Sequence, residues 1–311
     1  MAAPSEQESS DNARLGLILA LSAAFLFSTK PIIIKWLYEQ GMTALPLMWL
    51  RLMLAMPVYV VVGYFSWKRL AIKPSPTQMI QAAGIGLLGY YLASYLDLLG
   101  LEHVSAQLER LMLYAYPTLV VILGAQFFGQ PFKRAFIPAL ALTYVGLLVM
   151  YGHDLNNASL LTDGSKHAVS EITTGTLLIL ASALSFSLYI LFSKKAIGTL
   201  GSLLFTSVAM ASASVATFIH YALIHGIVMP EMNTERWVGT VIMAIFATVV
   251  PSFMVSEAIK RIGPAKTSVS GTIGPVMTTI MAVVFLGEPF GWMTVAGMAL
   301  VMFGVSRLQK T

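Results

Sequence analysis

Charged side chains inside long apolar segments are the residues of this sequence that could do chemistry. A charge in hydrocarbon is costly, so charged residues in membrane-spanning segments usually mark a pathway for a substrate, an ion or a proton. A helix rises ~1.5 Å per residue, so the place of each residue in its segment predicts its depth. We expect three cations and three anions to lie in one layer near the outer side of a membrane: Lys30, Arg51, Asp97, Glu102, Glu109 and Arg110.

Arg110 is the charged residue best suited to bind a substrate, because a guanidinium holds a carboxylate through two parallel hydrogen bonds. We predict that Arg110 and Asp97 contact the substrate, with Glu109 turned toward a neighbour such as Lys30. The role of the other charged residues has two interpretations. They form either a gate for a zwitterionic substrate or structural salt bridges, with side chains near helix ends reaching the headgroups. This charge network or gate comprises Lys30, Arg51, Glu102 and Glu109.

Tyrosines lie on the same segments as these charges. Tyrosine is often an interfacial anchor, but Tyr90, Tyr91 and Tyr114 lie away from the ends of their segments. A phenol at that depth needs a hydrogen-bond partner or a cavity. Tyr114 is also one helical turn from Arg110. We therefore predict that these three tyrosines bind substrate, the alternative being that they only anchor their helices.

The composition places these residues in a membrane protein. Hydrophobic residues make up 57% of the 311 residues and charged residues 11%, against about 25% charged in soluble domains. The net charge of +5 is not gathered on a basic face, so we expect the lipid bilayer and not nucleic acid as a partner. There is no cysteine, no phosphate-binding loop and no metal-ligand spacing among the five histidines, so we expect no cofactor and no metal.

Apolar runs of ~20 residues, enough to cross a bilayer as helices, divide the sequence. We predict an all-α membrane protein with a disordered tail at 1–13, a five-helix repeat at 14–151, a polar linker at 152–172 and a second five-helix repeat at 173–307. The predicted spans are 14–36, 45–67, 79–101, 105–128, 133–151, 173–195, 200–225, 237–259, 265–286 and 290–307.

The basic residues predict the orientation, because positively charged loops stay cytoplasmic. With both termini cytoplasmic, thirteen of the 19 Lys and Arg residues lie on the inner side. Only Lys35, Lys166 and Arg236 lie at the outer side. The linker 152–172 is then outside the cell membrane. The inner residues are Arg14, Lys68, Arg69, Lys73, Lys133, Arg134, Lys194, Lys195, Lys260, Arg261, Lys266, Arg307 and Lys310.

The two halves are similar in sequence. Pro117, Gly129, Pro131, Phe132 and Gly146 recur 158 residues later as Pro275, Gly287, Pro289, Phe290 and Gly304. Five spans per half is an odd number, so the second repeat is inverted relative to the first, as in transporters that alternate access to a central site. Both prolines lie near mid-membrane. Each removes a helix hydrogen bond, which predicts a hinge or a packing kink.

The second half carries a pattern that resembles the EamA repeat of the drug/metabolite transporter superfamily: Gly263-Pro264-Ala265, Pro275, Gly287-Glu288 and Gly304. The first half has Ser105-Ala106, Pro117 and Gly146, with Gln130 in place of the glutamate. The resemblance covers about 14–307. It implies a ten-helix transporter with cytoplasmic termini that moves a small metabolite, since members of that family export amino acids, sugars or amphipathic compounds.

We therefore expect a secondary transporter that exports amino acids or related amphipathic metabolites by alternating access, as a monomer or a homodimer in the cell membrane. The alternative is an intramembrane enzyme acting on a lipid or lipid-linked substrate, with Asp97 or Glu109 as general base. No paired nucleophile stands near either residue in the sequence, and the duplication argues against an enzyme.

Overall fold

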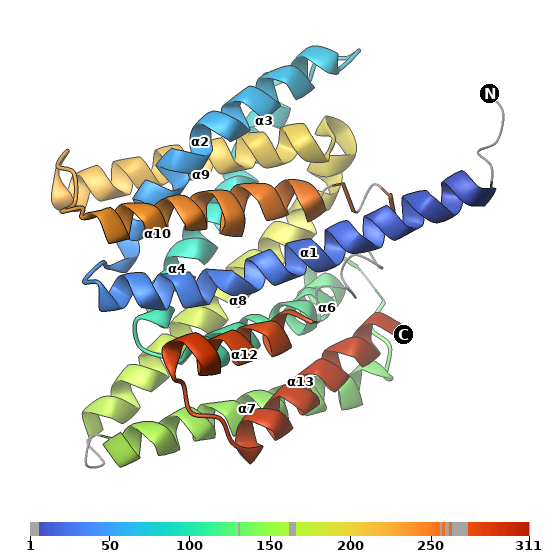
Figure 1. Cartoon of the computed structure of the whole chain (residues 1–311). Helices are drawn as coiled ribbons and strands as arrows, with labels where there is room; N and C mark the ends of the chain where they lie inside the picture. The colour runs from blue at the N-terminus through green and yellow to red at the C-terminus, as the bar shows by residue number, and fades with distance from the viewer. Residues whose placement is uncertain are drawn as a thin grey trace.

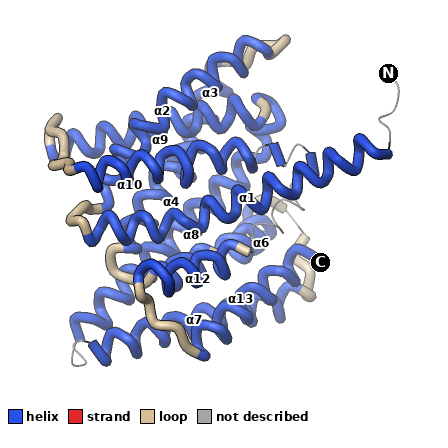
Figure 2. The backbone as a smooth tube through the Cα atoms, in the orientation of Figure 1, coloured by secondary structure: helices blue, strands red, loops and turns tan. Residues whose placement is uncertain are grey.

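The computed structural model describes residues 6–129, 131–161, 166–255, 257–258, 261–262 and 273–310, and over these residues it contains helices and no strands (Figures 1 and 2). The first half comprises α1 (Glu6–Glu39), α2 (Ala44–Arg69), α3 (Pro76–Gly86), the π-helical segment η1 (Leu87–Leu92), α4 (Ala93–Leu101), α5 (Ala106–Leu113), α6 (Tyr116–Phe127) and α7 (Phe136–Leu161). The second half comprises α8 (Lys166–Leu200), α9 (Ser202–His225), α10 (Thr234–Ala244), the π-helical segment η2 (Ile245–Val249), α12 (Gly274–Leu286) and α13 (Trp292–Lys310).

Eight helical stretches of the described residues are long and apolar enough to cross a membrane. Several combine shorter elements: α3, η1 and α4 form one stretch, Pro76–Leu101, and α5 with α6 forms another, Ala106–Phe127. Two further apolar helices, Gly274–Leu286 and Trp292–Leu308, are shorter. They coincide with the ninth and tenth predicted spans, and the start of the ninth, at 265–272, lies outside the described residues.

Several helices extend beyond the predicted limits. α7 continues to Leu161 and α8 begins at Lys166, so most of the segment 152–172 is helical and not an extended linker. α1 likewise begins at Glu6, within the segment expected to be a disordered tail. Apolar runs mark where a helix meets lipid, but the helix does not have to end there, because its own backbone hydrogen bonds continue into water.

Helices from the two halves pair with one another. α13 packs along α7, α9 along α2, α8 along α4 and α12 along α1 (Figure 1). Glycine permits the closest of these contacts. A Cβ atom added to Gly146 of α7 would lie 2.7 Å from the carbonyl oxygen of Gly297 of α13, closer than van der Waals packing allows. Small residues at membrane helix interfaces commonly allow such approach, and here they join the two halves into one body.

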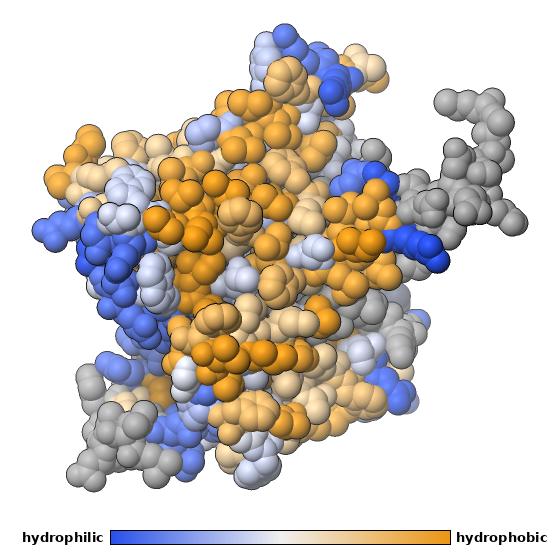
Figure 3. Space-filling model, viewed as in Figure 1, coloured by the Kyte–Doolittle hydropathy of each residue, from blue (hydrophilic) through white to orange (hydrophobic). Residues whose placement is uncertain are grey.

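The outer surface of this body is apolar. Figure 3 shows hydrophobic side chains across the middle of the visible face and hydrophilic ones gathered toward its margins. Exposed large hydrophobic residues include Val61, Phe65, Leu148, Leu177 and Phe285. A surface of this kind is suited to lipid, and the polar side chains of the interior are therefore separated from water by both protein and membrane.

Candidate functional site

Two helices of the structure begin at the prolines that the repeat predicts to be hinges. α5 ends at Leu113 and α6 begins at Tyr116, with Pro117 in the first turn of α6. Pro275 occupies the same place in the first turn of α12. A proline in the first turn costs no helix hydrogen bond, whereas one inside a helix breaks it. The fourth span is therefore a broken helix, and broken helices in transporters often line the substrate site.

Arg110 and Tyr114 lie on the α5 side of this break and converge on the start of α12. A Cβ atom built on Gly274 would lie 3.3 Å from Tyr114 Oη and 3.4 Å from Arg110 Nη2. Ser28 of α1 donates a hydrogen bond of 3.2 Å from Oγ to the carbonyl oxygen of Gly274. The absence of a side chain at Gly274 thus leaves room where α1, α5 and α12 meet, and the site combines groups from both halves.

The predicted layer of charges contains a connected group. Lys30 Nζ lies 2.7 Å from Asp97 Oδ2, and Asp97 interacts electrostatically with Glu109. Asp97 is 3% exposed and Glu109 1%. We expected Glu109 to face Lys30; the structure instead places Asp97 between them, because α4 contributes a carboxylate closer to the lysine. This group of Lys30, Asp97 and Glu109 is called the charge triad below.

Arg110 lies beside the charge triad without joining it. No hydrogen bond or ion pair links its guanidinium to another described residue, and its buried Nε has no hydrogen-bond partner. A guanidinium has five N–H donors, and leaving them unpaired inside a protein is costly. Arg110 is only partly buried. A guanidinium in these surroundings can bind an anionic group.

Arg51 and Glu102 lie outside the charge triad, and each has its own surroundings. Glu102 Oε1 accepts a hydrogen bond of 2.7 Å from the backbone N–H of Ala44, the first residue of α2, which is a helix-capping interaction. Arg51 is 4% exposed and its Nε has no partner among the described residues. Its side chain does not reach the surface, so the interpretation that it extends to the headgroups is wrong.

The three predicted tyrosines divide into two groups. A row of neighbouring aromatic rings runs from Tyr114 through Tyr116, Phe186 and Tyr189 to Tyr90, with ring centroids 5.1–6.4 Å apart. The Tyr189 hydroxyl donates a hydrogen bond of 3.0 Å to Tyr90 Oη. The structure thus connects Tyr90 with the Arg110 region by way of residues that the sequence did not single out.

Tyr91 lies apart from this row. Its hydroxyl is 3.0 Å from Nδ1 of His220 on α9, and Tyr95 packs edge-on against the same imidazole. Tyr90 and Tyr91 therefore have different surroundings, because successive residues of a helix point in different directions.

Glu288 is a polar residue of the site region to which the sequence assigned no role. Its Oε1 accepts a hydrogen bond of 2.6 Å from the backbone N–H of Ala106, and its Oε2 accepts one of 3.2 Å from Gln107. Gln107 Nε2 donates in turn to the carbonyl oxygen of Pro289. The second repeat thus caps the start of α5 in the first. Burial raises the pKa of Glu288, while the two backbone donors act in the opposite direction.

The same end of α5 has a second carboxylate from α7. The backbone N–H and the hydroxyl of Ser105 donate to Asp154 at 3.0 and 2.9 Å, and the Ser105 hydroxyl accepts from the N–H of Leu108. Asp154 was expected in a loop. Carboxylates near a helix N-terminus are stabilised by its unpaired N–H groups and its dipole. Together these contacts fix the half-helix that carries Glu109 and Arg110.

Replacing Glu288 by alanine should destabilise the protein by about 0.5–2 kcal/mol, the usual cost of losing a helix cap. Glu288→Gln should cost less, because its amide oxygen still accepts one hydrogen bond. The thermal unfolding midpoints of the purified proteins measure both changes. Glu231→Ala removes an exposed carboxylate elsewhere and should leave the midpoint unchanged. A midpoint for Glu288→Ala equal to that of the control would show that the cap contributes no stability.

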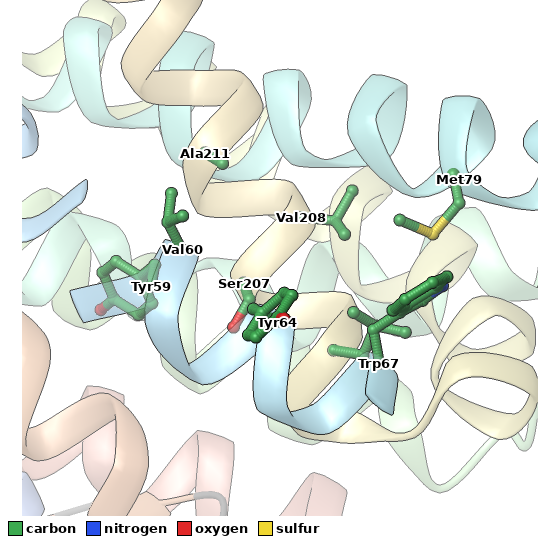
Figure 4. Close-up of a pocket in the computed structure, with 10 residues that line it drawn as sticks. Tyr59, Val60, Tyr64, Trp67, Met79, Ser207, Val208 and Ala211 are labelled. Carbon is green, nitrogen blue, oxygen red and sulfur yellow. The ribbon is translucent and has the colours of Figure 1, made fainter. Parts of the chain in front are cut away.

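A groove of about 290 Å³ lies elsewhere, between α2, α3 and α9 (Figure 4). Figure 4 shows Tyr64 and Trp67 on one side of it and Val208 and Met79 on the other. Tyr64 is 50% exposed, so the groove opens on the outer apolar surface. Its lining includes none of the charge triad and not Arg110. We assign the candidate site to the charged layer because its buried charged groups suit a polar solute better than this apolar lining.

Comparison with known proteins agrees with a transporter. The chain is 26% identical over 98% of its length to "Uncharacterized transporter YcbK" of Bacillus subtilis (strain 168), covering 96% of that protein. It is 21% identical over 94% of its length to "Uncharacterized transporter sll1319" of Synechocystis sp., covering 93%. A solved crystal structure has the same fold, with a TM-score of 0.64 over 94% of this chain and 95% of that one at 18% identity.

The family assignment follows from a match in each half. The model of the EamA-like transporter family matches residues 14–152 and again residues 173–308, and the resemblance drawn from the proline and glycine pattern is confirmed. The chain is a multi-pass helical membrane protein, and it belongs to the EamA-like transporter family.

Proposed function

We propose that this protein is a secondary transporter that exports small metabolites with an anionic group, such as amino acids or related amphipathic compounds, by alternating access. The observation that carries the proposal is the guanidinium of Arg110, which is free of hydrogen-bond partners among the described residues and lies at the break between α5 and α6. Tyr114 Oη and the start of α12 lie beside it. Such a combination of cation, phenol and helix N-terminus favours a carboxylate.

The architecture that we propose has ten spans in two inverted repeats, with both termini cytoplasmic. The cross-pairing of α2 with α9 and of α7 with α13 supports it, since these pairs join corresponding helices of the two halves. α1 begins and α13 ends at the same side of the body (Figure 1). Pro117 and Pro275, at the starts of two half-helices, are then the hinges about which matched bundles move.

Within this site Arg110 and Tyr114 contact the substrate, and Asp97 contributes through the charge triad. The aromatic row that ends at Tyr90 extends the site with apolar surface, which suits amphipathic compounds. Tyr91 does not belong to this aromatic row, because its hydroxyl pairs with His220. We therefore propose Tyr90 and not Tyr91 as part of the substrate pathway.

Counterflow into liposomes that contain only the purified protein tests the proposed function. Radiolabelled amino acids, sugars and nucleosides are offered to liposomes preloaded with the same unlabelled compound. We expect uptake of a carboxylate-bearing compound, and none in protein-free liposomes. Absence of counterflow for the whole panel, combined with turnover of a lipid that is lost in Glu109→Ala, would instead favour the intramembrane enzyme.

The topology gives an independent prediction. Leu160→Cys should react with a membrane-impermeant thiol reagent in intact cells, because the end of α7 is extracytoplasmic in the proposed orientation. No native cysteine gives a background signal. Labelling only after the cells are made permeable would contradict the proposed orientation and, with it, the inverted repeat.

A further inference from the structure

Asp97 and Glu109 are neighbours in the charge triad, and each has one buried carboxylate oxygen, Asp97 Oδ1 and Glu109 Oε2, without a hydrogen-bond partner among the described residues. An ionised carboxylate only accepts hydrogen bonds, so two neighbouring carboxylate oxygens can pair with each other only if one of them carries a proton. Both residues are almost completely buried, with 3% and 1% exposure, so these oxygens are shielded from bulk water.

The surrounding charges do not neutralise two carboxylates separately. Lys30 of α1 bonds Asp97 directly at 2.7 Å. Arg51 of α2 and Arg110 of α5 act on Asp97 only at longer range, without an ion pair. From α1, Lys35 and the Tyr38 hydroxyl also face Glu109 at longer range. The direct cation is thus shared by two acids, and two like charges in contact disfavour the ionisation of both.

The pair has no counterpart in the second half. At the repeat offset of 158 residues, the counterparts of Asp97 and Glu109 are Val255 and Thr267. The second half therefore fills these places without acids. Buried ionisable residues in membrane segments are expensive and are usually retained for a function.

We propose that Asp97 and Glu109 share one proton at neutral pH and form a proton-binding site. The proton exchanges with water past Lys30, the one member of the charge triad whose side chain is appreciably exposed, at 17%. With the proton bound, the pair carries a single negative charge that Lys30 neutralises, and Arg110 remains available to an anion. Loss of the proton leaves a second negative charge, which competes for Arg110. The link between this proton and substrate binding rests on the proposed function, whereas the site itself does not.

Infrared spectra of the full-length protein in liposomes test the site directly, with the proton as the probe. A neutral carboxyl group gives a C=O stretching band that an ionised one lacks. Free Asp and Glu side chains are ionised at pH 7, so a band that persists at pH 7 reports a protonated buried acid. We expect such a band in the unmodified protein. It should be absent in Glu109→Gln, whose amide N–H can donate to Asp97 but which has no carboxyl group to protonate, and shifted or lost in Asp97→Asn.

Two further variants make the assignment specific. Glu288→Gln removes another partly buried acid and should leave the band of the pair intact. Glu109→Asp keeps an acid at the position and should move the band without abolishing it, which protects the test if Glu109→Gln does not fold. The proposal is overturned if the unmodified protein shows no carboxyl band at pH 7. It is overturned as well if the only band disappears in Glu288→Gln, because the band then belongs to Glu288. It is also overturned if the band is unaffected by Asp97→Asn or by every change at Glu109. None of these outcomes depends on transport.

Discussion

Arg110→Lys should lower the affinity for an anionic substrate by about 1–3 kcal/mol, the scale of a hydrogen bond to a charged group, which corresponds to roughly 5- to 150-fold in the dissociation constant. A lysine keeps the positive charge but cannot form two parallel hydrogen bonds to one carboxylate. Arg110 has no bond to another described residue that the substitution would break, so the protein should fold normally. Concentration-dependent counterflow of the compound found in the panel measures the change.

The matched control for this prediction is Arg69→Lys. Arg69 is an exposed arginine at the end of α2, and the same substitution there should leave the affinity unchanged. If Arg110→Lys retains the full affinity, or if it fails to fold, Arg110 has a structural role and does not bind the substrate.

Lys30→Met should destabilise the protein strongly, because it leaves the charge of the buried pair without its direct cation. Removing one partner of a buried ion pair typically costs about 3–5 kcal/mol. The side chains of Lys30 and Asp97 are 17% and 4% exposed, so solvent screens this interaction only weakly. We expect the thermal unfolding midpoint of the purified protein to fall well below that of Lys195→Met, which removes an exposed lysine at the end of α8.

A second substitution distinguishes the two acids as partners of Lys30. The double variant Lys30→Met/Asp97→Asn should recover most of the lost stability, because neither partner is then left charged. Lys30→Met/Glu109→Gln should recover less, since Asp97 remains as a carboxylate beside the methionine. Better recovery with Glu109→Gln would show that Lys30 pairs with Glu109 and would contradict the geometry of the charge triad.

The sequence was sufficient to predict the helices and the family but not the pairing of the polar residues. Apolar runs and repeated prolines are local signals, and they indicated the apolar helices and the break before Pro117. The rotation of one helix against another depends on packing between distant segments. For that reason the layer of charges was predicted, whereas the contact of Lys30 with Asp97 in place of Glu109 was not.

Arg51 and Glu288 also have surroundings that depend on tertiary packing and could not be predicted from the local sequence. Arg51 was expected to reach the headgroups from its place near a helix end, but tertiary packing encloses it. Glu288 belongs to the family pattern, yet its contact with Ala106 spans 182 residues of sequence, and no local spacing predicts such a cap. The helical continuation of α7 to Leu161 was missed for a different reason, because polar composition marks exposure to water and not the end of a helix.

Alternating access to the Arg110 site is the central claim, and the reactivity of a cysteine at Ser28 tests it most directly. Ser28 bonds the carbonyl oxygen of Gly274 beside Arg110, and cysteine is close to serine in size. The chain has no native cysteine. Leu160→Cys and Ser306→Cys serve as controls that should react only from the outside and only from the inside, respectively. We predict that Ser28→Cys reacts with an impermeant thiol reagent from either side, in intact cells and in inverted vesicles. Reaction from one side alone, or from neither, would contradict the account.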